Sequence, residues 1–148
     1  MKCLVLLGAL AYVLVVACTP PTVAQPSPFR SSRIEYDSVV ARREPGPHNG
    51  GGETTAFSFF GNENGLPIVF RKRELHAGSA IGYHRNDEDE IYYVLSGRGE
   101  LTLNTERRLV GSGTAILTRA GDSHGLRQLG AEDLVIIITY PRSPSSKP

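Results

Sequence analysis

Short β-type segments separated by turn residues make up most of this chain and restrict it to few folds. Between residues 54 and 140, apolar and β-branched runs recur at intervals of roughly 8–12 residues, with glycine, asparagine or proline between them. No segment shows the sustained 3.6-residue period of a helix. The chain is therefore expected to fold as an all-β barrel or jelly roll. The expected strands are 54–60, 68–75, 80–84, 91–95, 99–104, 107–110, 114–118, a short run through 124, and 134–140.

Three further segments carry expectations about the edges and the centre of this barrel. Residues 134–140, Leu-Val-Ile-Ile-Ile-Thr-Tyr, have apolar residues on both faces and are expected in the middle of a wall. Residues 34–40 alternate weakly, which predicts a first, edge-type strand. Residues 42–52 contain two prolines and four glycines, which predicts a loop.

Polar side chains of metal-binding types stand at the facing ends of two expected strands. His84 and Asn86 are two residues apart, so they share one face of a strand. Glu90 opens the next apolar run after an acidic turn, and His124 lies on a later strand. A barrel can bring these side chains to one interior point. Imidazole and carboxylate ligands suit a divalent first-row metal, and two histidines with one carboxylate leave coordination positions open.

Two motifs in this region resemble those of the cupin superfamily. The first has the pattern glycine, His-x-His, glutamate, glycine, and here reads Gly78-x5-His84-x-Asn86-x3-Glu90-x6-Gly97. The second here reads Gly113-x5-Arg119-x-Gly121-x2-His124-x3-Gln128. Three positions depart from the family: asparagine replaces the second histidine, arginine replaces a usual proline, and glutamine replaces a usual asparagine. The resemblance covers residues 54–140 and implies a single-domain cupin jelly-roll β-barrel.

The resemblance also implies a metal site. His84, Glu90 and His124 match the positions that hold a divalent metal in cupins, so Fe, Mn, Ni or Zn is expected on them. Asn86 is the doubtful fourth ligand, because a neutral amide oxygen binds such metals weakly. It is expected to ligate weakly, to hydrogen-bond a metal-bound water, or to leave a position open for substrate. A degenerate pocket without metal is the alternative.

Two functional classes follow from that site. One is a small-molecule oxygenase or isomerase that uses the metal, for which the sequence assigns no catalytic residue. The other is a non-catalytic cupin that binds a small ligand such as a sugar. Cupins often dimerise through sheet edges, so a homodimer is expected.

The remaining polar and aromatic residues near the motifs are expected to have structural roles. Asp87 and Glu88 could replace the missing histidine, but their turn is expected to point outward. Histidines in glycine-flanked turns and the arginine of the second motif are expected at the surface, and tyrosines in the wall or core. These residues are His48, His76, Arg119, Tyr83, Tyr92 and Tyr93.

The N-terminus resembles a bacterial lipoprotein signal. A positive start and a long apolar run lead to Val-Val-Ala-Cys, so residues 1–17 are expected to be a signal peptide and Cys18 the lipidated residue. The apolar run falls short of the ~20 residues that span a bilayer, which disfavours an uncleaved anchor. A plain secretory signal is the other alternative. The expected product is an exported lipoprotein of the periplasm or cell surface.

This reading divides the chain into four parts. A Pro/Ser-rich tether covers residues 18–32, the cupin domain 33–141, and a disordered tail 142–148. The only cysteines are Cys3 and Cys18, which excludes thiolate chemistry and disulfides from the domain. A net charge of +1 without a basic cluster argues against nucleic acid as a partner. The expected partners are a small molecule and, through the lipid, a membrane.

Overall fold

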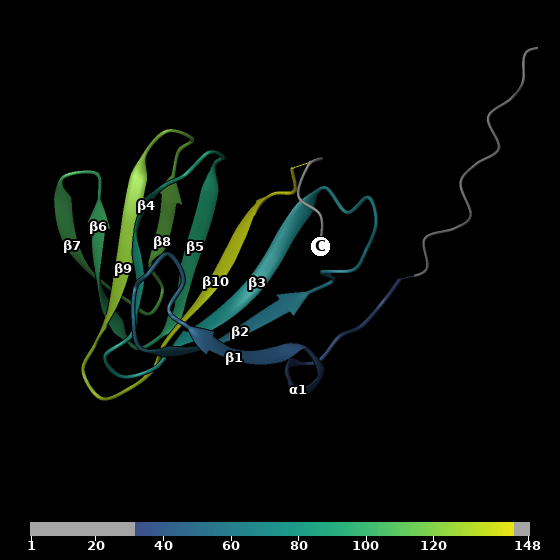
Figure 1. Cartoon of the computed structure of the whole chain (residues 1–148), viewed down its shortest axis with the longest axis horizontal. Helices are drawn as coiled ribbons and strands as arrows, with labels where there is room; N and C mark the ends of the chain where they lie inside the picture. The colour runs from purple at the N-terminus through teal and green to yellow at the C-terminus, as the bar shows by residue number, and fades with distance from the viewer. Residues whose placement is uncertain (1–31, 144–148) are drawn as a thin grey trace, which may run out of the picture. The chain divides into compact units, whose positions relative to one another are not determined.

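Two antiparallel β-sheets form the domain in the computed structural model, which describes residues 32–143 (Figure 1). Residues 1–31 and 144–148 are outside this part, so the expected signal peptide, Cys18, and nearly all of the tether and tail lie outside the described residues. Among residues 32–143, no helix is long and apolar enough to cross a membrane. The strands are β1 Ala41–Pro45, β2 Glu53–Phe59, β3 Ile68–Leu75, β4 Ala80–Arg85, β5 Glu90–Ser96, β6 Arg98–Leu103, β7 Glu106–Gly111, β8 Ala115–Thr118, β9 Ser123–Leu129 and β10 Leu134–Pro141.

The strands form two sheets, one larger than the other. One sheet has the order β1-β2-β3-β10-β5-β8, and the other has the order β4-β9-β6-β7. β10 lies between β3 and β5, as expected for a strand with apolar residues on both faces. The all-β, jelly-roll fold predicted from the sequence is thereby confirmed.

The core fills the space between these layers. Leu75 of β3, Val94 of β5 and Leu126 of β9 are fully or almost fully buried, as are Leu134 and Ile136 of β10. Alternate residues of β10 point into this core, which is the two-residue period of a strand. Full burial of such a side chain contributes about 1.5–3 kcal/mol, so the two sheets are held together mainly here.

Two expectations at the N-terminal edge were wrong. Residues 34–40 do not form a strand, because Asp37–Val40 form the short helix α1, whose turn is closed by hydrogen bonds from Val39 and Val40 to the carbonyl of Tyr36. Residues 42–52 are not all loop, because β1 pairs with β2 over Ala41–Pro45. Proline is tolerated there because β1 is an edge strand and Pro45 is its last residue.

Candidate metal centre

His84, Glu90 and His124 converge from three strands of the two sheets. One ligand atom from each lies within 4.8 Å of the other two. His84 and His124 face each other across the β4–β9 pair, and Glu90 comes from the first position of β5 in the opposite sheet. Metal–ligand bonds of about 2.0–2.2 Å place ligand atoms roughly 3–4 Å apart, so small side-chain shifts would close this group on an ion.

Hydrogen bonds orient both imidazoles. Nδ1 of His84 lies 2.8 Å from the carbonyl oxygen of Gly82, and a carbonyl only accepts, so Nδ1 carries the proton and Nε2 keeps its lone pair. Nδ1 of His124 lies 2.6 Å from the buried hydroxyl of Thr118. Such partners fix the tautomer and the orientation of metal-binding histidines. Both Nε2 atoms therefore face the site, and that of His124 lies 3.2 Å from Oε2 of Glu90.

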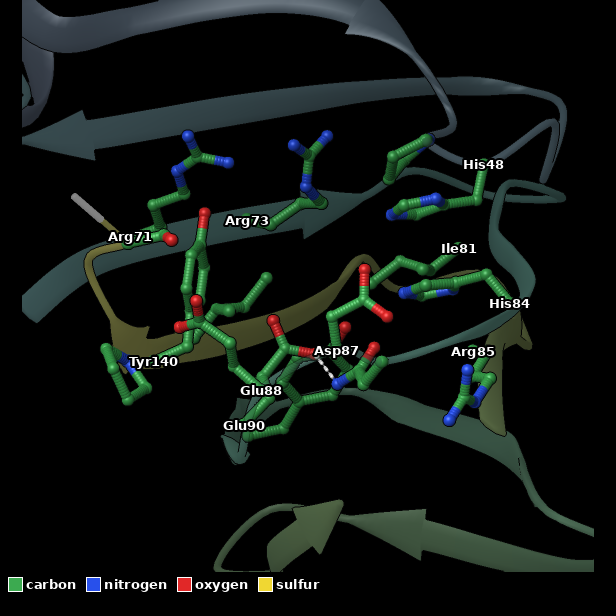
Figure 2. A pocket seen from close by; sticks show the side chains of 16 residues that line it. His48, Arg71, Arg73, Ile81, His84, Arg85, Asp87, Glu88, Glu90 and Tyr140 are labelled. Carbon is green, nitrogen blue, oxygen red and sulfur yellow. Dashed lines mark hydrogen bonds between the residues drawn. The ribbon is translucent and has the colours of Figure 1, made fainter. Parts of the chain in front are cut away.

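Asn86 is buried, and its side chain contacts the carboxylate of the candidate site. Its Nδ2 donates to Oε2 of Glu90 at 3.1 Å, and this bond is the dashed line in Figure 2. Because a carboxylate only accepts, the amide nitrogen must face Glu90. None of the three expected roles for Asn86 includes this contact. In the structure, the Asn86 side chain orients the Glu90 carboxylate through this hydrogen bond.

The electrostatics of the site keep Glu90 charged and Tyr92 neutral. Burial by itself raises the pKa of Glu90, but hydrogen bonds from His124 and Asn86 outweigh it and hold the pKa below its ordinary value. Burial, and then the Glu90 carboxylate, raise the pKa of the Tyr92 hydroxyl well above its ordinary value. That hydroxyl lies 3.2 Å from Nε2 of His124, so Tyr92 belongs to the site as well as to the core.

His48 has a contact that the sequence did not predict. It is exposed, as expected, but its ring stacks on that of His84, with centroids 3.4 Å apart and 5° between the planes. Partial burial and the neighbouring His84 lower the pKa of His48. Its loop lies against β4, where the N–H of Gly82 donates to the carbonyl of Pro47 at 2.9 Å. A glycine inside a strand often marks a place where another backbone segment comes close. Gly82 is such a glycine, and it is the feature of the sequence that indicates the contact between the His48 loop and β4.

A cavity of about 340 Å³ opens beside the candidate ligands (Figure 2). Arg71 and Arg73 line it from β3, with Tyr140 of β10 near them. Asp87 and Glu88 also line it, so the acidic turn does not simply point outward as expected. Neither belongs to the group of donor atoms that could hold a metal among the described residues.

The other residues noted in the sequence lie away from this centre. His76 is partly exposed and contacts Asp133 and Thr55, both at 2.9 Å. Arg119 is largely exposed and pairs with Asp89, as its expected turn position suggested. Tyr83 of β4 and Tyr93 of β5 lie in the wall, as expected, but they are 57% and 44% exposed, so neither is a core residue.

Comparison with known proteins shows which class of protein this fold and site are similar to. Residues 72–140, a little under half of the chain, match the family model described as the cupin domain. This segment contains all three candidate ligands. The cupin resemblance seen in the motifs is therefore supported over these residues.

Two curated proteins match part of this chain at moderate sequence identity. An oxalate-binding protein from Thermotoga maritima is 34% identical over 67 residues, which cover 45% of this chain and 55% of that protein. An uncharacterized protein from Streptomyces coelicolor is 30% identical over 66 residues, covering 45% of this chain and 62% of the relative. The matched segment thus spans little more than half the length of these curated relatives.

Solved structures share the fold. A crystal structure described as a predicted oxalate decarboxylase, also from Thermotoga maritima, superposes with a TM-score of 0.67 at 23% identity, covering 75% of this chain and 100% of its own. The polyketide cyclase RemF from Streptomyces resistomycificus superposes with a TM-score of 0.65 at 22% identity, covering 78% and 83%. At these identities the likeness concerns the fold.

Proposed function

We propose that this protein is a lipid-anchored cupin that holds a divalent metal on His84, Glu90 and His124 and binds a small carboxylate ligand at that metal. One observation carries the proposal. Three ligand atoms of suitable type lie within 4.8 Å of one another beside a cavity, and hydrogen bonds at Nδ1 turn both imidazoles toward the site.

The donor set suits the chemistry. Two imidazoles and one carboxylate are ligands for Fe, Mn, Ni or Zn and leave positions open. A metal bound there would act as a Lewis acid toward an oxygen-rich ligand. Asn86 holds Glu90, Thr118 orients His124, and the Tyr92 hydroxyl stays protonated as a hydrogen-bond donor beside the site. A carboxylate ligand is supported by the relative named for oxalate binding.

If the protein also converts the bound molecule, it would act as a small-molecule oxygenase or isomerase. The rival is a non-catalytic cupin that binds a small ligand such as a sugar in a metal-free pocket. The rival is favoured by the contacts of Glu90, whose Oε2 lies 3.1 Å from Nδ2 of Asn86 and 3.2 Å from Nε2 of His124. These two contacts give the carboxylate oxygen hydrogen-bond partners within the protein itself.

Metal content separates the two. The full chain is purified in mild detergent without a metal-affinity tag, treated with chelator, and reloaded with Fe(II), Mn(II), Ni(II) or Zn(II) before mass spectrometry of bound metal. The proposal expects about one ion per chain, lost in His84→Ala and kept in the control His76→Ala, whose imidazole has partners outside the cavity. Substoichiometric metal that no reloading raises, unchanged by His84→Ala, supports the rival. Dioxygen consumption with a candidate substrate then distinguishes an oxygenase from a binder.

Export and lipidation form a separate part of the proposal. The supporting feature is the apolar run that ends in Val-Val-Ala-Cys. The wild type is expected in the membrane fraction with a lipidated N-terminal peptide that begins at Cys18. Cys18→Ser is expected to leave unlipidated precursor. A membrane-bound wild type whose N-terminal peptide begins elsewhere would overturn this part.

We also propose a homodimer that forms through a sheet edge. The edge strands are β1 and β8 of the larger sheet and β4 and β7 of the smaller one. Light scattering of the purified protein tests it, and a monomeric mass at micromolar concentration would overturn it.

A further inference from the structure

Arg71 presents an unpaired positive charge to the cavity. Its guanidinium lies 5.8 Å from the centre of the Tyr140 ring, and its buried Nε has no hydrogen-bond partner. Among residues 32–143, no carboxylate lies within ion-pair distance of it. Arg73, on the same face of the same strand, is by contrast occupied by Glu44 at 2.6 Å and Thr54 at 2.7 Å. Arg71 is therefore the arginine of β3 that remains available to a ligand.

The strand register places Arg71 a short distance from the candidate ligands. Arg71 is level with Ile138 of β10, which is level with Tyr92 of β5, and Glu90 lies two residues before Tyr92 on the same face. Strand spacing of about 4.8 Å and a rise of about 3.4 Å per residue put the Cα atoms of Arg71 and Glu90 about 12 Å apart. Both side chains line the cavity (Figure 2). This separation is several times the roughly 1.5 Å carbon–carbon bond that joins the two carboxylates of oxalate.

The charge of the cavity favours a ligand with two negative groups. A divalent metal on His84, Glu90 and His124 would keep one positive charge once the Glu90 carboxylate is counted. The Arg71 guanidinium, which lines the same cavity without an ion-pair partner among residues 32–143, supplies a second positive charge. Arg73 adds no further charge, because Glu44 neutralises it. Because a guanidinium binds carboxylates through paired hydrogen bonds, a second carboxylate is the natural partner of Arg71.

We propose that the cavity takes a dicarboxylate longer than oxalate, with one carboxylate at the metal and the other on Arg71. This inference rests on the proposed metal function, because the metal holds the first carboxylate. Oxalate, whose two carboxylates are joined by a single carbon–carbon bond of about 1.5 Å, is too short to span from the metal ligands to Arg71. Arg71 is then the residue that selects dicarboxylates over monocarboxylates.

Glu88 is the internal competitor for this role. Its carboxylate lies on the same side of the cavity as Arg71 and Tyr140 in Figure 2, and its buried Oε2 has no hydrogen-bond partner among the described residues. If Arg71 and Glu88 pair with each other in solution, Arg71 is not available for a ligand. A ligand that takes Arg71 leaves Glu88 as a nearby repelling charge, so Glu88→Gln is expected to tighten dicarboxylate binding a few-fold.

The test uses the full chain in its metal-loaded and chelator-treated forms and measures binding by calorimetry. The probes are oxalate, malonate, succinate and glutarate, with butyrate as the monocarboxylate matched to succinate. Wild type is expected to bind succinate at least about tenfold more tightly than butyrate, the size of one charged hydrogen-bonded contact. Arg71→Met is expected to abolish this ratio without changing metal content, and Arg71→Lys to reduce it. The control Arg119→Met, which removes an exposed arginine paired with Asp89, is expected to change nothing.

The outcomes separate this inference from the proposed function. Metal at one ion per chain with a succinate preference unaffected by Arg71→Met overturns the role of Arg71 and leaves the metal site standing. Absent metal, with succinate binding that Arg71→Met abolishes, overturns the metal function and keeps Arg71 as the anion site. Destabilisation of the fold by both Arg71→Lys and Glu88→Gln, with unchanged succinate affinity, would show an internal pair and overturn the inference.

Discussion

The imidazole rings of His48 and His84 lie face to face, 3.4 Å apart between centroids and only 5° from parallel. His84 belongs to the cupin motif, whereas His48 comes from the β1–β2 connection, which precedes the segment that matches the family model. The backbone of His48 is in the left-handed region, with φ of 52°, a strained conformation for a non-glycine residue. A segment outside the motif thus covers one face of a candidate ligand.

His48 is expected to act as a positioning residue for His84. Removing the stacked ring in His48→Ala frees the His84 ring to rotate, and aromatic pairs contribute about 0.5–1.5 kcal/mol. Metal affinity, measured by competition with a chromogenic chelator, is expected to fall about two- to tenfold. His48→Phe keeps a flat ring and is expected to retain most of the affinity. Equal loss of bound metal in both variants, at the level of His84→Ala, would instead make His48 a ligand.

Asn86 is expected to contribute by holding Glu90. Asn86→Leu removes the 3.1 Å bond to Oε2, so the carboxylate is less well oriented and metal affinity is expected to fall about 10–100-fold, as for other residues that support metal ligands. Asn86→His adds an imidazole and is expected to bind metal more tightly than Asn86→Leu. The same chelator competition measures both. Unchanged affinity in Asn86→Leu would show that Glu90 needs no such support.

Gly82→Ala is expected to unfold or severely destabilise the domain. A Cβ at this position would collide with the carbonyl oxygen of His48, and backbone cannot move aside as a side chain can. The expected loss is more than about 3 kcal/mol of unfolding free energy, measured by urea denaturation. Gly111→Ala is the matched control, because it also lies in a strand and its nearest new neighbour would be 3.7 Å away. Equal stability of the two variants would contradict the close approach of the His48 loop to β4.

The metal-free protein is expected to lose stability in acid partly through Glu90. Hydrogen bonds hold the folded-state pKa of Glu90 below its unfolded value of about 4.3, even though burial acts in the other direction. Its contribution is therefore fully present above the unfolded pKa and is lost as the pH falls through the folded pKa. Urea denaturation of chelator-treated protein between pH 7 and pH 3 is expected to show a shallower acid slope in Glu90→Gln than in wild type. Glu106→Gln, at an exposed ion pair, is expected to keep the wild-type slope.

Local patterns were sufficient for the strands and for most of the candidate site. Alternation and turn residues located β2 to β10 within a few residues, because a half-buried strand needs a two-residue period and a turn needs glycine, asparagine or proline. Motif spacing indicated which side chains would meet, and His84, Glu90 and His124 do meet. Their binding of a metal stays a prediction.

Features that depend on contacts distant in the sequence could not be predicted. Residues 34–40 alternate weakly, yet they form α1 and irregular backbone instead of a strand, whereas β1 forms next to them because the exposed edge of β2 offers hydrogen bonds. Tyr83 and Tyr93 look like core residues by type, but they point away from the space between the sheets. Burial is decided by which face of a strand meets another layer.

The sequence by itself determined the β periodicity, the turns and the spacing that brings three metal-ligand types onto strand ends. These are local properties, because they depend only on the type of each residue and on its separation from others along the sequence. Only the tertiary structure decided that His48 stacks on His84, that Asn86 bonds to Glu90, and that Arg71 is left unpaired while Arg73 is not. The His48 and arginine contacts depend on which strands become neighbours and on how a loop crosses them, whereas Asn86 meets Glu90 through the turn that joins β4 to β5. Side chains far apart in the sequence, such as the His48–His84 pair and the Arg73–Glu44 pair, acquire partners only once the sheets have closed.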